Sequence, residues 1–143
     1  MKKEDVLKGY SIVNDAKLTK LDDIAKFKVI KACKEMKPIV TELQEFEKDA
    51  REKLKGENHE AMIKQAEQWR EEGENTTLTI DERKALNKYF EDYNNKVVKC
   101  LADELQSDLD ATWEKLSEEE LKKFVASNDW NVQQTISVMG LFE

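Results

Sequence analysis

Few residues in this sequence have the type and spacing needed for catalysis or metal binding. The only histidine, His59, lies in the stretch GENHEAM between Glu57 and Glu60. No second histidine stands at the spacing of a zinc motif, and a zinc site needs three or four convergent ligands. His59 is therefore predicted to be a solvated residue near a helix start, and neither a metal nor a cofactor is expected.

The two cysteines, Cys33 and Cys100, are far apart in the sequence. Both fall at apolar positions of predicted helices, which favours small buried side chains in a reducing compartment over a disulfide. A cysteine nucleophile would need a basic partner, and the only histidine lies in a predicted linker. The sequence also lacks the phosphate-loop, dinucleotide-binding and nucleophile-elbow motifs. We therefore expect no catalytic residue, no small-molecule substrate and no enzymatic activity.

The composition indicates a helical protein. The chain has 143 residues, enough for one domain, and only four glycines and one proline to make turns. Its formal net charge of −7 argues against general nucleic-acid binding and against attachment to an anionic membrane. No stretch resembles a signal peptide or a membrane span, so we expect a cytoplasmic protein.

Charge is unevenly distributed along the chain. Residues 1–40 contain ten lysines and six acidic residues, a balance of +4, whereas the remaining 103 residues carry −11. This asymmetry favours docking of the basic N-terminal part on the acidic remainder. A second interpretation stays open, in which the lysine-rich helix 17–37 contacts nucleic acid.

Apolar periodicity and capping signals predict an all-α single domain over residues 1–143. In the first predicted helix, the apolar face comprises residues 21, 24, 25, 29, 32, 33 and 36. Pro38 suits the first position of a second helix, although one helix continuous through a kink is also compatible with it. The predicted helices are 20–36, 38–55, 58–71, 80–108, and a C-terminal pair, 118–127 and 129–139. Ser117 and Glu120 form a capping box at the start of this pair, and Asn128 or Asp129 is expected to cap its second helix.

Two apolar stripes set the expected arrangement of these helices. They begin near Ile39 and Leu86, have similar lengths and show the spacing of helices packed side by side. We expect them to form a long antiparallel helical hairpin, with the N-terminal helix packed along it and the C-terminal helix pair closing one end.

The C-terminal segment WNVQQTISVMGLF contains thirteen residues without a charge. Neutral residues on both sides of a helix favour intramolecular packing, while an exposed apolar surface of this size would indicate binding. The residues of this candidate partner surface are Trp130, Val132, Ile136, Met139, Leu141 and Phe142.

Two resemblances accompany these patterns. The stretch LKKFVASNDWNVQQTISVM resembles the last two helices of ubiquitin-associated three-helix modules, although their Met-Gly loop lies upstream and MGLF here follows the last helix. Three stretches within residues 10–135 are similar to small uncharacterised helical-hairpin proteins of phages, prophages and gut Bacteroidetes. They are LTKLDDIAKFKVIKACKEMKPIVTELQEFEKDAREKLK, LTIDERKALNKYFEDYNNKVVKCLADEL and LSEEELKKFVASNDWNV. That resemblance implies a phage-related accessory or assembly role and no functional residues.

Together these observations predict a non-enzymatic interaction or assembly protein that acts through helical surfaces, by self-association or with a protein partner. The alternative is a nucleic-acid-associated regulator that uses the lysine-rich helix 17–37.

Overall fold

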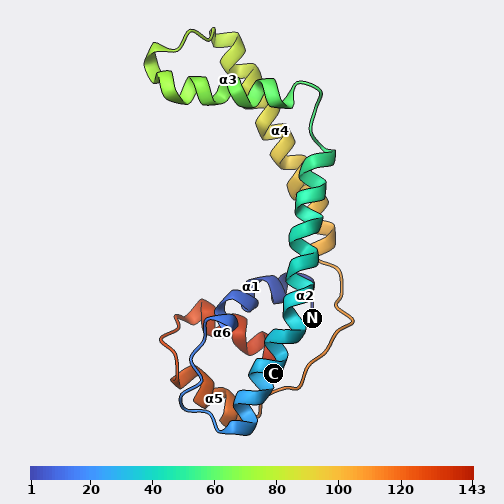
Figure 1. The fold of residues 1–143 in the computed structure, drawn as a ribbon, viewed down its shortest axis with the longest axis vertical. Coiled ribbons are helices and arrows are strands. Elements are labelled where there is room, and N and C mark those ends of the chain that lie inside the picture. The colour runs from blue at the N-terminus through green and yellow to red at the C-terminus, as the bar shows by residue number, and fades with distance from the viewer. The chain divides into compact units, whose positions relative to one another are not determined.

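The computed structural model describes residues 1–143 and confirms an all-α fold (Figure 1). Its helices are α1 (Lys3–Asn14), α2 (Asp23–Lys53), α3 (His59–Glu72), the short 3-10 helix η1 (Gly73–Asn75), α4 (Ile80–Leu105), α5 (Glu118–Ala126) and α6 (Val132–Phe142). The chain forms two compact units: unit 1 comprises residues 1–45 and 103–143, and unit 2 comprises residues 46–102. Helices α2 and α4 each have residues in both units. The division into units does not test whether the chain is one domain or whether these two helices pair along their full length, so both statements stay predictions.

Helix α2 continues through Pro38, so the predicted pair of helices, 20–36 and 38–55, is one helix. A proline inside a helix removes one backbone hydrogen bond and costs about 3 kcal/mol or more. Here Pro38 is exposed, whereas Met36 and Val40 on either side of it are buried. Burial of the stripe on both sides of the proline therefore outweighs the lost bond.

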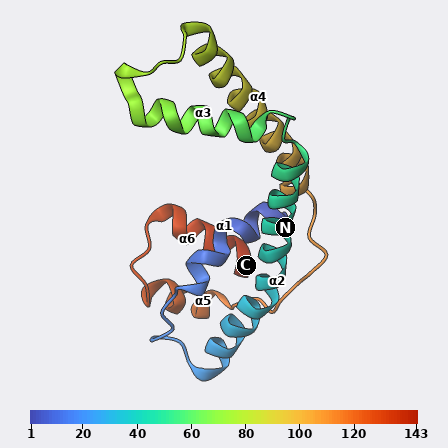
Figure 2. The ribbon, with the colours of Figure 1, turned by 45° about the horizontal axis from the view of Figure 1, so that its top comes forward.

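The N-terminal helix α1 was missed by the sequence analysis. Val6, Gly9 and Val13 are its buried residues, spaced by three and four as one face of a helix requires. In both views of the ribbon, α1 packs against α6 (Figure 2). The contact is close, since a Cβ atom built on Gly9 would lie 2.3 Å from Cδ1 of Leu141.

The C-terminal helix pair begins at two capping boxes. Ser117 Oγ accepts the backbone N–H of Glu120 at 3.1 Å, as the sequence predicts. The last helix starts later than predicted, because Asn131 caps it by accepting the backbone N–H of Gln134. Asn128, one of the predicted caps, instead accepts the backbone N–H of Lys17 at 2.7 Å and donates to its carbonyl oxygen at 2.9 Å. This exchange ties the α5–α6 turn to the segment that precedes α2.

Unit 2 contains α3, η1, most of α4 and the last turns of α2. Leu86, Tyr93 and Val97 are the buried residues of α4, on the predicted stripe. Tyr93 Oη donates to the backbone oxygen of Arg51 at 2.6 Å, which fixes the end of α2 against α4. The predicted helices 58–71 and 80–108 correspond to α3 and α4 within three residues at each end.

Candidate protein-interaction site

The six candidate partner-surface residues of the C-terminal segment divide between the core of unit 1 and its surface. Leu141 and Phe142 are fully buried, and Trp130 and Met139 are partly buried against the core. Val132 and Ile136 are exposed, at 75% and 57%. The end of the segment is therefore core and is closed to a partner in this fold. A partner role stays a prediction for the two exposed residues and for Met139, which is only partly buried.

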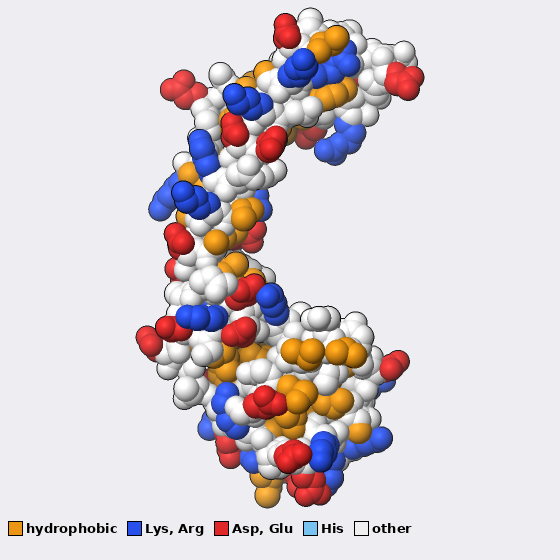
Figure 3. Space-filling view, turned by 180° about the vertical axis from the view of Figure 1, so that it is seen from behind, with side chains coloured by type: hydrophobic (Ala, Val, Ile, Leu, Met, Phe, Trp, Pro, Cys, Tyr) orange, Lys and Arg blue, Asp and Glu red, His pale blue; other side chains and the backbone are white.

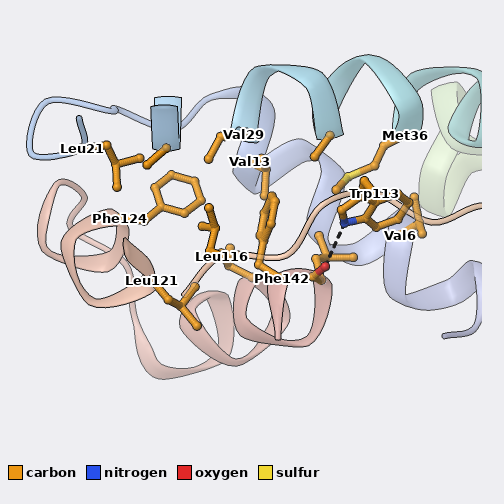
Figure 4. Packing of buried hydrophobic residues seen from close by; sticks show 14 of the residues in the cluster. Val6, Val13, Leu21, Val29, Met36, Trp113, Leu116, Leu121, Phe124 and Phe142 are labelled. Carbon is orange, nitrogen blue, oxygen red and sulfur yellow. Dashed lines mark hydrogen bonds between the residues drawn. The ribbon is translucent and has the colours of Figure 1, made fainter. Parts of the chain in front are cut away.

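Aromatic rings fix α6 against α5 in the core of unit 1 (Figure 4). Phe124 is fully buried, and its ring centroid lies 5.0 Å from that of Trp130 and 5.9 Å from that of Phe142, both edge to face. Trp113 Nε1 donates to the backbone oxygen of Leu141 at 2.8 Å, so one carbonyl at the end of α6 is satisfied by a buried donor. These contacts hold α5 and α6 in a fixed position relative to each other.

Between α5 and α6 lies an apolar groove of about 650 Å³, which we call the α5–α6 groove. Its volume falls within the roughly 300–1,000 Å³ of typical ligand pockets. Apolar side chains form most of its lining, and charged side chains stand at its rim. The apolar lining residues are Leu116, Leu121, Val125, Ala126 and Met139, and the charged ones are Glu118, Lys122 and Glu143.

One face of α2 exposes three large apolar side chains, which we call the α2 row. Ile24, Phe27 and Ile30 are 71%, 65% and 57% exposed. They follow one another at intervals of three residues and so lie along the same side of the helix. Lys31 and Lys34 are exposed on this side as well, four and seven residues after Phe27. Exposed Asp23 lies four residues before Phe27 on the same side, so the row is an apolar surface whose border carries two lysines and one carboxylate.

The sequence analysis placed Ile24 on the buried face of its helix, and this was wrong. Leu21, Ala25 and Val29 occupy the positions that face the core of unit 1. Ile24 precedes Ala25 by one residue, which turns its side chain by about 100° away from that arc. For an apolar residue at the edge of the buried face, the elements that pack against the helix decide whether the side chain is buried or exposed.

The lysine at the centre of the predicted basic helix is engaged inside unit 1. Lys28 Nζ lies 3.0 Å from a carboxylate oxygen of Glu120 and 3.7 Å from one of Glu114. The hydrogen bond to Glu120 is the main reason that the pKa of Lys28 is raised. A backbone hydrogen bond from Ser117, and then Lys28, lower the pKa of Glu120. Salt bridges from Lys2 to Asp108 and from Lys3 to Glu104 likewise join the basic N-terminal part to acidic residues.

His59 does not have the solvated position that the sequence predicts. It is 5% exposed in unit 2, where its ring lies among those of Tyr89, Phe90 and Tyr93. Its Nδ1 atom is 2.6 Å from Tyr89 Oη. Three aromatic residues separated from it by at least thirty positions bury it, and local sequence gives no signal of that. Its role here is packing, with one hydrogen bond to satisfy the ring.

Other candidate chemistry is sparse. No group of three or more His, Cys, Asp or Glu side chains is placed to hold a metal ion. Cys33 is half-buried, and burial raises the pKa of its thiol, which lowers the fraction present as the nucleophilic thiolate. Cys100 is exposed, contrary to its predicted apolar environment, because Val97 takes the buried position on that part of α4.

No helix combines the length and the hydropathy needed to cross a lipid bilayer. When the chain was compared with protein families, curated proteins and solved structures, none of them matched it.

Proposed function

We propose that this protein is a non-enzymatic interaction or assembly protein that works by presenting helical surfaces of unit 1. The observation that carries the proposal is the α2 row. Three large side chains stay exposed together on a helix whose other apolar positions are largely buried. Clustered apolar surface of this kind commonly marks a binding site, and a row on one helix suits insertion into a groove.

The proposal extends to origin and location. A phage or prophage source rests on the resemblance of the long charged helices to proteins of that kind. A cytoplasmic location is supported by the two unpaired cysteines, since reducing compartments keep thiols free.

A nucleic-acid-associated regulator is the second candidate. Its support is the set of exposed lysines near Phe27, namely Lys17, Lys20, Lys31, Lys34 and Lys37. Against it, Lys28 is neutralised by two carboxylates, and the whole chain carries −7. Phosphate contacts need a net positive surface, so protein binding is the better-supported function.

The test is photo-crosslinking from the α2 row in cells that produce the protein. A benzophenone-bearing phenylalanine in place of Phe27 keeps the aromatic ring in the row. The matched control carries the same group at Ser11, an exposed position on α1. We expect a discrete protein adduct from position 27 and none from position 11. An adduct that nuclease removes would favour the regulator, and equal labelling from both positions would overturn the proposal.

A further inference from the structure

Unit 1 leaves two apolar features uncovered, and their shapes are opposite. The α2 row is convex, since its three side chains project from one helix with more than half of their surface exposed. The α5–α6 groove is concave, with Leu116 and Leu121 deep in its lining, each 7% exposed. In Figure 3, orange hydrophobic patches lie between charged side chains on the surface of unit 1. The row lies outside the core, whereas the groove opens over core residues, since Leu116 and Leu121 belong to the core of unit 1.

The charges that border the two features are also opposite. Exposed Lys31 and Lys34 share the side of α2 that carries the row. The groove has Glu118 and Glu143 at its rim, and its one lysine, Lys122, is paired with Glu118 at 3.3 Å. The Lys122–Glu118 pair is neutral as a whole, which leaves Glu143 as the net negative charge of the rim. On the side of the row, Lys31 and Lys34 outnumber the one exposed carboxylate, Asp23. The row therefore has a net basic border and the rim a net acidic one. Opposite borders favour contact between the two features and specify its register.

A contact between two like surfaces is less favourable. Packing one α2 row on another would bring the lysines of both copies together in a desolvated place, where like charges repel. Packing one groove on another would leave an empty space between the two concave surfaces. The side chains that line this space would then lack the van der Waals contacts that stabilise an interface. The chain thus holds one complementary pair of surfaces, and its two members lie at different places on unit 1.

We propose that the α2 row of one copy of this chain docks in the α5–α6 groove of a second copy. This deepens the proposed function and rests on it, because it names the partner as the chain itself. The contact is heterologous, because it joins two different surfaces. In a dimer one copy keeps a free groove and the other a free row, so association continues into a ring or an open chain. A contact built on one helix and a short groove is small, which makes it weak and dependent on protein concentration.

Two substitutions at exposed positions separate the two surfaces. Phe27→Gln removes the central ring of the row and leaves the groove intact. Ala126→Lys places a long cationic side chain in the groove and leaves the row intact. The control is Val98→Gln on α4, which removes an exposed apolar side chain outside both surfaces and outside the candidate partner surface of the C-terminal segment. Circular dichroism and urea unfolding verify the fold of each variant, and Glu118→Lys at the rim replaces Ala126→Lys if that variant does not fold.

Sedimentation velocity over a wide range of concentrations measures the association. We expect the average mass of the wild-type chain and of Val98→Gln to rise with concentration. Removing a central contact should weaken association by roughly tenfold or more in each blocked variant. An equimolar mixture of the two blocked variants should form a dimer that grows no further. The intact row of Ala126→Lys can dock in the intact groove of Phe27→Gln, and the dimer then has no other intact row or groove.

Three outcomes would overturn the self-docking. The wild-type chain could stay monomeric, the blocked variants could associate as the wild type does, or their mixture could fail to dimerise. A monomeric chain that still gives a protein adduct from position 27 would retain the proposed function with a different partner. Absence of both association and adduct would remove the function and the inference together.

Discussion

Replacement of Gly9 by alanine should destabilise unit 1, although helix propensity alone predicts the reverse. In an exposed helix, alanine in place of glycine stabilises by about 1 kcal/mol. At this position the new Cβ would lie 2.3 Å from Cδ1 and 3.0 Å from Cγ of Leu141. Leu141 is fully buried, so its side chain has no free space to move into. Overpacking of this kind costs about 1–3 kcal/mol. The expected net loss is about 1 kcal/mol.

The same substitution should change sign when Leu141 is first shortened to alanine. Leu141→Ala by itself costs about 2–5 kcal/mol, because it removes buried atoms and leaves a cavity. In that background the two clashing atoms are gone, and Gly9→Ala recovers its helix propensity of about 1 kcal/mol. The double-mutant cycle should therefore give a coupling free energy of about 2 kcal/mol.

Urea unfolding followed by tryptophan fluorescence measures these free energies in unit 1 alone. Trp113 and Trp130 both lie in unit 1, whereas Trp69 lies in unit 2, so all four proteins of the cycle carry Trp69→Phe. If Gly9→Ala stabilises the protein equally with and without the Leu141 side chain, then α1 and α6 do not cross at Gly9. The core described for unit 1 would then be incorrect.

Three further predictions concern one helix cap, one carboxylate and one tyrosine hydroxyl. Ser117→Ala removes the acceptor of the α5 capping box and should cost about 1 kcal/mol in the same urea assay, and an unchanged midpoint would contradict the cap. Glu120→Gln removes a carboxylate whose pKa the fold lowers from its ordinary 4.5. A lowered pKa contributes stability above the ordinary value, and that contribution is lost as the pH falls through the folded value. The variant should therefore be less stable than the wild type at neutral pH, with the difference closing in acid; a difference independent of pH would refute this. Tyr89→Phe removes the hydroxyl that lies 2.6 Å from His59 and should destabilise unit 2 by about 1–3 kcal/mol, seen as faster amide exchange in α3. Unchanged exchange there would show that the hydrogen bond is not needed.

Local signals in the sequence predicted α3 to α6 within three residues at each end, but they missed α1 and divided α2 at Pro38. The capping box at Ser117 is complete within four residues, so no distant contact is needed to recognise it. The buried residues of α2 continue the same spacing across Pro38, from Ala25 to Ala50. Both features depend on residues of one helix, so the spacing of apolar and capping residues along the sequence is enough to predict them.

Features that depend on distant residues were not accessible to that reasoning. His59 is buried by aromatic rings of α4, which lie at least thirty residues away in the sequence. Ile24 is exposed because no other element packs over its side of α2. The α5–α6 groove exists only after two helices have packed, because its lining comes from both of them and from their flanks. Helical periodicity gives the direction of an apolar face, but it gives neither the width of the covered arc nor the space left between two packed helices.

The most direct test of the central claim is paramagnetic relaxation between two copies of the chain. One copy is ¹⁵N-labelled, and the other is unlabelled and carries a nitroxide on Lys122→Cys at the groove rim, with both native cysteines changed to alanine. Docking of the α2 row in the groove predicts broadening of the amide signals of residues 24–31 in the labelled copy, and reduction of the nitroxide should restore them. Signals of 24–31 that are as sharp with the nitroxide as after its reduction, at concentrations where the chain associates, would contradict the account.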